Sequence, residues 1–215
     1  MVEVKVLTDI LAANDAIAEV NRKIFKEAGV LSLNLMSSPG AGKTSLLERT
    51  LEALSDELKF GIVEGDIATT RDAERLEKFD VPITQINTQS ECHLDANMVH
   101  GAIKDFPFAG LDVLIIENVG NLVCPAEFVV GEDHKMMLLS VTEGDDKPLK
   151  YPLMFHESSL LLINKTDLLP YVDFDMEVAK RNALQVSPKL DILTISCKTG
   201  EGLDEWFDWI RAQRV

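Results

Sequence analysis

Three short polar motifs, each placed directly after an apolar run, constrain the fold of this chain more than any other feature. They are SSPGAGKT at residues 37–44, ENVG at residues 117–120 and NKTD at residues 164–167. A continuous apolar run is typical of a parallel strand buried on both faces, and ligands bind where such strands end. We therefore expect the three motifs to meet at one edge of a parallel sheet.

Apolar and amphipathic segments alternate along nearly the whole chain. An apolar repeat from Ile10 to Ile24 predicts an N-terminal helix that starts at Thr8 or Asp9 and stops at Gly29. The pattern predicts an α/β fold, a mostly parallel central sheet with helices on both faces. We expect a single P-loop GTPase domain over residues 1–215, with the helix of residues 1–29 packed on it. The predicted strands are 30–36, 60–63, 82–87, 113–116, 135–142, 159–163 and 192–195. Besides the N-terminal helix, the main predicted helices are 44–58, 91–106, 176–185 and 202–214.

Composition excludes several classes of function. The formal net charge of -15 argues against a nucleic-acid or anionic-membrane partner. No run approaches the ~20 apolar residues of a membrane span, and the first residues lack the order of a secretion signal. The three cysteines favour free or metal-bound thiols in a reducing compartment. We therefore expect a cytoplasmic protein.

Residues 37–44 have the composition of a phosphate-binding loop at the start of a helix. Gly40 and Gly42 let the backbone approach phosphate oxygens, whose charge the helix N-terminus favours. Lys43 can reach the β- and γ-phosphates, and the hydroxyl of Thr44 can coordinate Mg²⁺. Ser37 occupies the place where such loops usually open with glycine. The predicted phosphate-binding residues are Gly40, Ala41, Gly42, Lys43, Thr44 and Ser45.

The NKTD motif can read guanine. The carboxylate of Asp167 can accept hydrogen bonds from guanine N1–H and the 2-amino group, which adenine does not offer. The stem of Lys165 can lie over the base, and Asn164 can brace the neighbouring loops. Backbone N–H groups after the last strand could donate to guanine O6, from Ser196, Cys197 and Lys198.

Two acidic residues are candidates for the magnesium and catalytic roles. Asp66 ends the second predicted strand and Glu117 ends the strand of residues 113–116. Gly120 could donate its N–H to the γ-phosphate and release it on hydrolysis. Asn121 stands where a glutamine would orient the attacking water. We therefore expect slow GTP hydrolysis with Lys43, Asp66 and Glu117 in catalytic roles.

A second set of residues can bind a metal. Cys92 and His93 are adjacent, and Cys124 follows the switch motif. Thiolate and imidazole suit Zn²⁺, and Ni²⁺ in a tetragonal geometry. Because Cys124 follows Gly120 closely, motion of the switch would move a ligand.

A helix of residues 91–106 capped by Ser90 would place Cys92 in its first turn, where the dipole lowers a thiol pKa. His100 would then share a helical face with His93 and is a candidate further ligand of nickel or zinc. Asp95 is a weaker candidate.

With these motifs, the sequence resembles the HypB-type GTPases, SIMIBI-class P-loop proteins that incorporate nickel into nickel–iron hydrogenases. The resemblance covers nearly the whole chain, and ENVGNLVCP and EGDDKPLKYP are its most specific segments. The segments that carry it are residues 37–44, 64–66, 91–94, 117–125, 143–152 and 164–167.

The resemblance implies a GTP- and Mg²⁺-dependent homodimer, promoted by GTP or metal, with nickel or zinc at Cys92, His93 and Cys124 near the interface. It implies two partners, a small zinc-containing nickel chaperone and a hydrogenase large subunit. Lys150 would reach nucleotide across the dimer. The family's N-terminal Cys- or His-rich extension is not expected here.

Two alternatives remain open at this stage. A urease-type nickel GTPase would carry Cys-Pro-His, whereas Cys124 and Pro125 precede Ala126. The chain could also be a non-catalytic GTP switch whose zinc staples a dimer. The apolar group from Leu168 to Phe174 could belong to the core or to a dimer contact.

Overall fold

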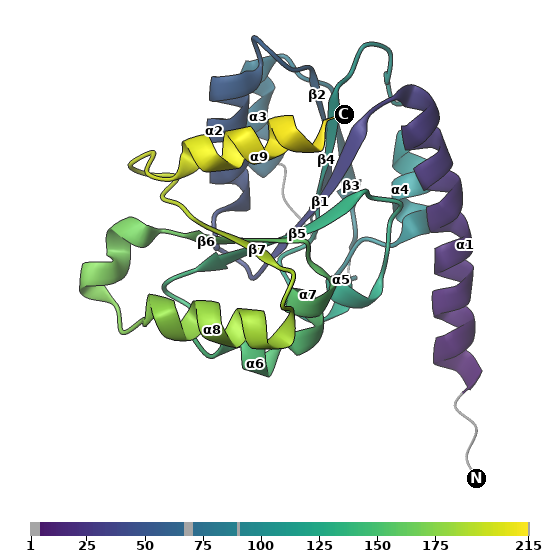
Figure 1. Cartoon of the computed structure of the whole chain (residues 1–215). Coiled ribbons are helices and arrows are strands. Elements are labelled where there is room, and N and C mark those ends of the chain that lie inside the picture. The colour runs from purple at the N-terminus through teal and green to yellow at the C-terminus, as the bar shows by residue number, and fades with distance from the viewer. Residues whose placement is uncertain (1–4, 67–70, 90, 215) are drawn as a thin grey trace.

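Within the residues that the computed structural model describes, 5–66, 71–89 and 91–214, seven parallel strands form one sheet (Figure 1). Their spatial order is β3-β2-β4-β1-β5-β6-β7, so the chain crosses over the sheet repeatedly. This confirms the predicted α/β fold with a parallel central sheet. The strands are β1 (Leu31–Ser37), β2 (Phe60–Asp66), β3 (Ile83–Asn87), β4 (Val113–Glu117), β5 (His134–Ser140), β6 (Leu160–Asn164) and β7 (Asp191–Thr194).

Helices cover both faces of the sheet (Figure 1). One face packs on α2 (Lys43–Leu54) and α9 (Leu203–Gln213). The other face packs on α1 (Lys5–Ala28) and α4 (Ala96–Ile103) over β2 and β4, and on α7 and α8 over β5 and β6. The remaining elements are α3 (Arg71–Leu76), η1 (Glu77–Phe79), α5 (Cys124–Glu127), α6 (Lys147–Lys150), α7 (Pro152–Glu157), η2 (Thr166–Tyr171) and α8 (Met176–Val186).

The apolar runs of the sequence follow from this layering. Successive strand residues point to opposite faces, so Leu35 of β1 packs towards α2 and α9 while Met36 packs towards α7 and α8. Both side chains are fully buried. A strand buried on both faces cannot alternate apolar with polar residues, which is why it reads as a continuous run.

The N-terminal helix is longer than its sequence pattern predicts. It begins at Lys5 and ends at Ala28, so Thr8 and Asp9 lie inside it and do not start it. Asn21, fully buried, donates from Nδ2 to the carbonyl oxygens of Ala96 at 2.8 Å and Val130 at 3.0 Å. These bonds fix α1 to the start of α4 and to the loop before β5 (His134–Ser140).

The largest difference from the predicted elements concerns α4. The sequence predicts a helix over residues 91–106, but α4 spans only Ala96–Ile103. Asp95 is its N-cap and accepts from the N–H of Met98 at 2.7 Å. The predicted cap, Ser90, lies outside the described residues. The helix therefore starts after Cys92 and His93, which lie in the segment leading into it.

Across the described parts of the chain, no helix combines the length and hydrophobicity needed to span a membrane.

The apolar contact between α2 and α9 also contains one buried hydrogen bond. Trp206 donates from Nε1 to the hydroxyl of Thr50 at 2.9 Å, and both residues are almost completely buried. We expect Thr50→Val to lower the free energy of unfolding by about 1–3 kcal/mol, because the indole N–H loses its acceptor. Urea denaturation measures the change. Thr199→Val, an exposed substitution of the same kind, should change it by less than about 0.5 kcal/mol; equal effects would contradict the prediction.

Candidate nucleotide and metal site

The phosphate loop lies between the end of β1 and the start of α2. Gly40 and Gly42 adopt positive φ of 74° and 109°, a conformation that glycine takes without a steric penalty. A Cβ at Gly42 would lie 2.6 Å from Nδ2 of Asn164. The loop is thus held against the base-binding motif so closely that no side chain fits at Gly42.

Two lysines cross this loop. Lys43 Nζ donates to the hydroxyl of Ser37 at 3.1 Å, and Lys165 Nζ donates to the carbonyl oxygen of Gly40 at 2.6 Å. Ser37, at the position where glycine is usual, therefore serves as an acceptor for Lys43. Both lysines also line one cavity of 320 Å³ at this loop, together with Thr44.

The predicted magnesium and catalytic residues meet beside the loop. The hydroxyl of Thr44 donates to Oε1 of Glu117 at 3.4 Å. Asp66 and Glu117 line a cavity of 240 Å³ together with Lys43 and Gly120. A Cβ at Gly120 would lie 3.0 Å from Cα of Pro39, so the switch glycine nearly touches the phosphate loop. The hydroxyl and carboxylates fit a magnesium ion, for which oxygen ligands are preferred.

Glu64 lines the same cavity, although it was not among the predicted site residues. It is 2% exposed and lies opposite Glu117 in the parallel register of β2 and β4. The available signal was its spacing, because residues two apart on a strand share a face, and Asp66 is two residues later. The cavity therefore contains three carboxylates.

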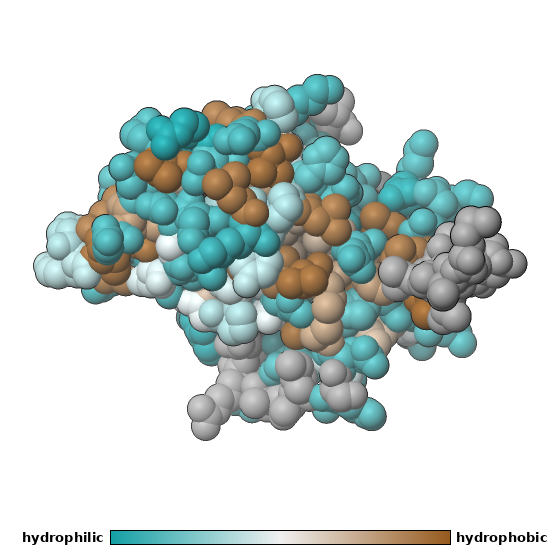
Figure 2. Space-filling view, turned by 90° about the horizontal axis from the view of Figure 1, so that it is seen from below, coloured by the Kyte–Doolittle hydropathy of each residue, from teal (hydrophilic) through white to brown (hydrophobic). Residues whose placement is uncertain are grey.

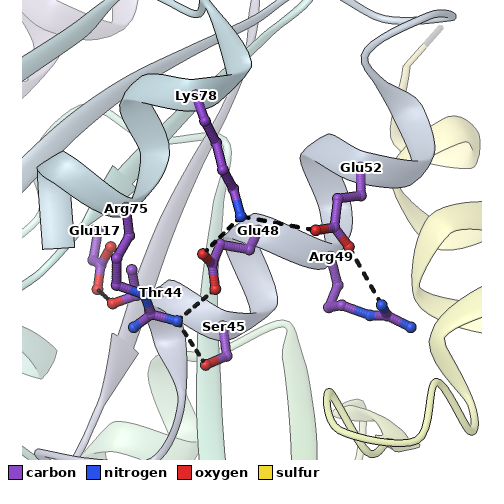
Figure 3. A network of polar contacts seen from close by, with 8 residues as sticks. All are labelled: Thr44, Ser45, Glu48, Arg49, Glu52, Arg75, Lys78 and Glu117. Atoms are coloured by element: carbon purple, nitrogen blue, oxygen red, sulfur yellow. Dashed lines mark hydrogen bonds and ion pairs between the residues drawn. The ribbon is translucent and has the colours of Figure 1, made fainter.

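A cation that the sequence pattern did not indicate also lies beside the loop. Arg75 lines a cavity of 320 Å³ with Lys43, Thr44 and Glu117. Its guanidinium donates to the hydroxyl of Ser45 at 3.2 Å and pairs with Glu48, which Lys78 also contacts (Figure 3). Burial of Glu48 opposes ionisation, yet the hydrogen bonds from Arg75 and Lys78 lower its pKa overall. The network ties α3 to the first turns of α2.

The base-reading motif forms a separate cavity of 360 Å³. Asn164 connects its walls, donating from Nδ2 to the carbonyl of Ala41 at 2.9 Å and accepting at Oδ1 from the N–H of Cys197 at 3.2 Å. Asp167 accepts from the hydroxyl of Ser196 at 2.7 Å. The lining residues are Gly42, Ser45, Asn164, Lys165, Asp167, Leu168, Cys197 and Lys198.

Two of the three backbone N–H groups predicted to reach guanine O6 bond to other residues of the chain in this structure. The N–H of Ser196 donates to the carbonyl of Glu201 at 2.9 Å, and that of Cys197 donates to Asn164. Both groups shape the loop in this structure, and donation from Ser196, Cys197 or Lys198 to guanine O6 stays a prediction.

Cys92, His93 and Cys124 form a cluster in which one ligand atom of each lies within 4.8 Å of the others. The two sulfurs are 2.9 Å apart, and Cys92 Sγ lies 3.8 Å from His93 Nδ1. The ring of His93 packs on Phe128 with centroids 4.1 Å apart. The hydrogen bond with Cys92 and partial burial raise the pKa of the Cys124 thiol. Two sulfurs and one imidazole nitrogen fit a Ni²⁺ or Zn²⁺ ion.

Two expectations about this cluster are wrong. Cys92 precedes α4 and does not lie in a helical first turn, so the helix dipole does not act on it as predicted. His100 lies on the α1 side of α4, where its Nδ1 is 2.9 Å from Oδ1 of Asn21, and it does not join the cluster. The weaker candidate, Asp95, caps α4.

The fold and the loop geometry define a P-loop nucleotide-binding protein. A family model described as "CobW/HypB/UreG, nucleotide-binding domain" matches residues 31–194. Hydrogenase maturation factor HypB of Escherichia coli (strain K12) is 50% identical over 214 residues, covering 100% of this chain and 73% of that protein. The chain therefore belongs to the CobW/HypB/UreG family and, within it, to the HypB proteins.

Solved structures agree with this assignment. HypB from Archaeoglobus fulgidus is 41% identical with a TM-score of 0.89, covering 95% of this chain and 100% of that one. HypB from Helicobacter pylori, in complex with nickel, is 40% identical with a TM-score of 0.89, covering 94% and 95%.

Burial raises the pKa of the Cys197 thiol from an ordinary 9.0 to about 11. The thiol stays protonated at neutral pH, so about a hundredth of the usual thiolate is present to react. We expect alkylation of Cys197 by iodoacetamide to keep rising with pH and to level off only near 11. Peptide mass spectrometry resolves the site. A short cysteine peptide is the control, and levelling below pH 9 would contradict the prediction.

Proposed function

We propose that this protein is a GTP-hydrolysing metallochaperone that carries nickel for insertion into a nickel–iron hydrogenase. The observation that carries the proposal is the position of the Cys92–His93–Cys124 cluster. Its third ligand lies four residues after Gly120, the glycine that contacts the phosphate loop. A change at the γ-phosphate therefore acts on a segment that contains a metal ligand.

The nucleotide chemistry follows from the residues around the loop. Lys43 and the backbone of residues 40–44 bind the phosphates, and Thr44 with the carboxylates of Asp66 and Glu117 would hold Mg²⁺. That ion would neutralise charge on the phosphates. Asn121 is engaged through both ends of its amide, with Cys92 O and Val123 N, so it is poorly placed to orient water. This supports slow intrinsic hydrolysis, with Asp66 or Glu117 positioning the water.

Nickel is the cargo in this proposal. The solved structure of the H. pylori relative is described as a complex with nickel, and it resembles this chain over 94% of its length. The same donor set accepts Zn²⁺ at least as readily, so zinc is the competing occupant. The HypB relatives of Azotobacter vinelandii and Escherichia coli are named hydrogenase maturation factors, which supports hydrogenase as the client. HypB of Helicobacter hepaticus, 41% identical, is named a hydrogenase/urease maturation factor, so urease is the competing client.

The partners in the proposal are a second copy of the chain, a small zinc-containing nickel chaperone and the hydrogenase large subunit. Exposed apolar side chains are available near the cluster and on α6 and α7: Val123 is 52% exposed, Leu149 51% and Leu153 42%. Seen from the side of α6 and α8, apolar residues form several groups on a largely hydrophilic surface (Figure 2). Lys150 is exposed and pairs with Asp146, so reaching a partner's nucleotide would break that pair.

Asp167→Asn should convert the base specificity. The variant loses two charge-assisted hydrogen bonds from guanine, which raises the Kd for GDP by roughly 30- to 1000-fold, or about 2–4 kcal/mol. Xanthine has a carbonyl in place of the 2-amino group, and the amide of Asn can donate to it, so XDP should bind more tightly to the variant than to the wild type. Calorimetry measures both constants. Asp173→Asn, which removes the same charge from an exposed site, should change neither; unchanged GDP affinity in Asp167→Asn would refute the assignment.

The metallochaperone proposal is tested by titrating Ni²⁺ in GDP and in a non-hydrolysable GTP analogue, with turnover and oligomeric state measured on the same samples. We expect the Ni²⁺ affinity to differ several-fold between nucleotides, because the switch segment contains Cys124. Cys124→Ala should abolish both high affinity and the difference, whereas Cys197→Ala should leave the cluster intact. Equal affinity in both nucleotides would favour the zinc-stapled, non-catalytic switch.

A further inference from the structure

Two asparagine side chains join the switch segment to the loop that carries the other metal ligands. Asn118 Oδ1 accepts from the backbone N–H of Leu94 at 3.0 Å and of Val119 at 2.9 Å. Asn121 Nδ2 donates to the carbonyl oxygen of Cys92 at 3.3 Å. The bond of Asn121 therefore ends on Cys92, a candidate ligand, and the bond of Asn118 ends on Leu94, the residue after His93.

Asn118 is also anchored to β1, the strand that leads into the phosphate loop. Asn118 Nδ2 donates to Oδ1 of Asn34 on β1 at 3.2 Å, and Asn34 Nδ2 donates to Oε1 of Glu132 at 3.0 Å. Asn34 and Asn118 are fully buried. Breaking the hydrogen bonds of a buried amide costs free energy, because no water reaches the amide to replace the lost partners. Leu94 is therefore constrained to follow Asn118 if that residue moves.

The two asparagines bracket the residues that face the nucleotide. Val119 and Gly120 stand between them, and Gly120 approaches Pro39 of the phosphate loop. A displacement of Gly120 changes the backbone at both asparagines at once. It reaches Cys124 through the chain and the Cys92–His93 segment through the two amides.

We propose that Asn118 and Asn121 are positioning residues that transmit the nucleotide state to the Cys92–His93 half of the metal site. This rests on the proposed function, because it assumes that the cluster binds metal and that nucleotide changes its affinity. Coupling through Cys124 alone would move one ligand relative to two fixed ones. With the amide bonds, all three ligands respond to the same four-residue segment.

Asn21 is a buried asparagine whose amide bonds have a purely structural role. Asn21 bonds Ala96, Val130 and His100, so it connects α1 to α4 and to the loop before β5, with no bond to residues 118–121. Asn21 bonds the backbone of Ala96, close to Leu94, which Asn118 bonds, and the two asparagines are equally buried. This makes Asn21→Ala a matched control for loss of a buried amide.

The test compares Ni²⁺ affinity in GDP and in a non-hydrolysable GTP analogue for the wild type, Asn118→Ala, Asn121→Ala and Asn21→Ala. We expect both switch variants to reduce the nucleotide-dependent ratio of Ni²⁺ affinities at least threefold, with GDP affinity within twofold of wild type. Linkage requires Ni²⁺ to alter the ratio of nucleotide affinities by the same factor, so that ratio should shrink equally. Asn21→Ala should lower the melting temperature and leave both ratios unchanged.

Where Asn118→Ala does not fold, Asn121→Ala carries the test by itself, because it removes the bond to the carbonyl oxygen of Cys92. Asn121 is partly exposed, so its variant should fold in any case. An unchanged nucleotide-dependent ratio in Asn121→Ala, and in Asn118→Ala where it folds, would overturn the assignment while leaving the proposed function standing. A wild-type protein whose Ni²⁺ affinity ignores nucleotide would overturn both.

Discussion

The parallel pairing of β1 with β4 is the constraint on which the site depends. It places Leu35 beside Glu117, and the N–H of Asn118 continues the pairing by donating to the carbonyl of Leu35 at 3.0 Å. The phosphate loop begins where β1 ends and the switch segment begins where β4 ends. Successive residues of β1 face different layers, so a slip of one residue would turn Asn34 into the apolar layer beneath α2 and α9 and break its bond to Glu132. Such a slip is strongly disfavoured. Core packing thereby fixes the distance between phosphate and switch.

An acidic protein can bind a polyanionic nucleotide because its charges are distributed unevenly. Lys43, Lys165 and Arg75 surround the phosphate loop, and the carboxylates of Glu64 and Glu117 line the adjoining cavity with Lys43. Cations attract the phosphates directly, whereas the carboxylates need a divalent ion between them and the nucleotide. The net charge therefore does not describe the field at the site.

Much of the fold could be predicted from the sequence because its determinants are local. Continuous apolar runs gave the buried strands, and the glycines of residues 37–44 marked the loop whose backbone only glycine adopts easily. The start of α4 could not be predicted, because Ser90 and Asp95 are equally good caps by composition. Tertiary contacts decide between them: Leu94 packs against Gly65 and its N–H is taken by Asn118.

The same limit applies to the candidate site. Cys92, His93 and Cys124 were identifiable from residue type and from their place beside the switch, but their mutual distances depend on the pairing of distant strands. The error about His100 came from extending a helix through His93, which made two unrelated residues share a face. Glu64 could have been found from its spacing to Asp66, whereas the asparagine bridges are contacts between distant segments that only the folded chain shows.

The metal cluster draws its ligands from two segments that are 32 residues apart at Cys92 and Cys124. An unfolded chain offers these ligands only by closing a loop, which costs conformational entropy. A metal ion that binds the folded state more tightly stabilises it by mass action. Under the proposed function, loading with nickel should therefore protect the protein from unfolding and proteolysis. The split ligand set would then favour metal binding by correctly folded copies of the chain.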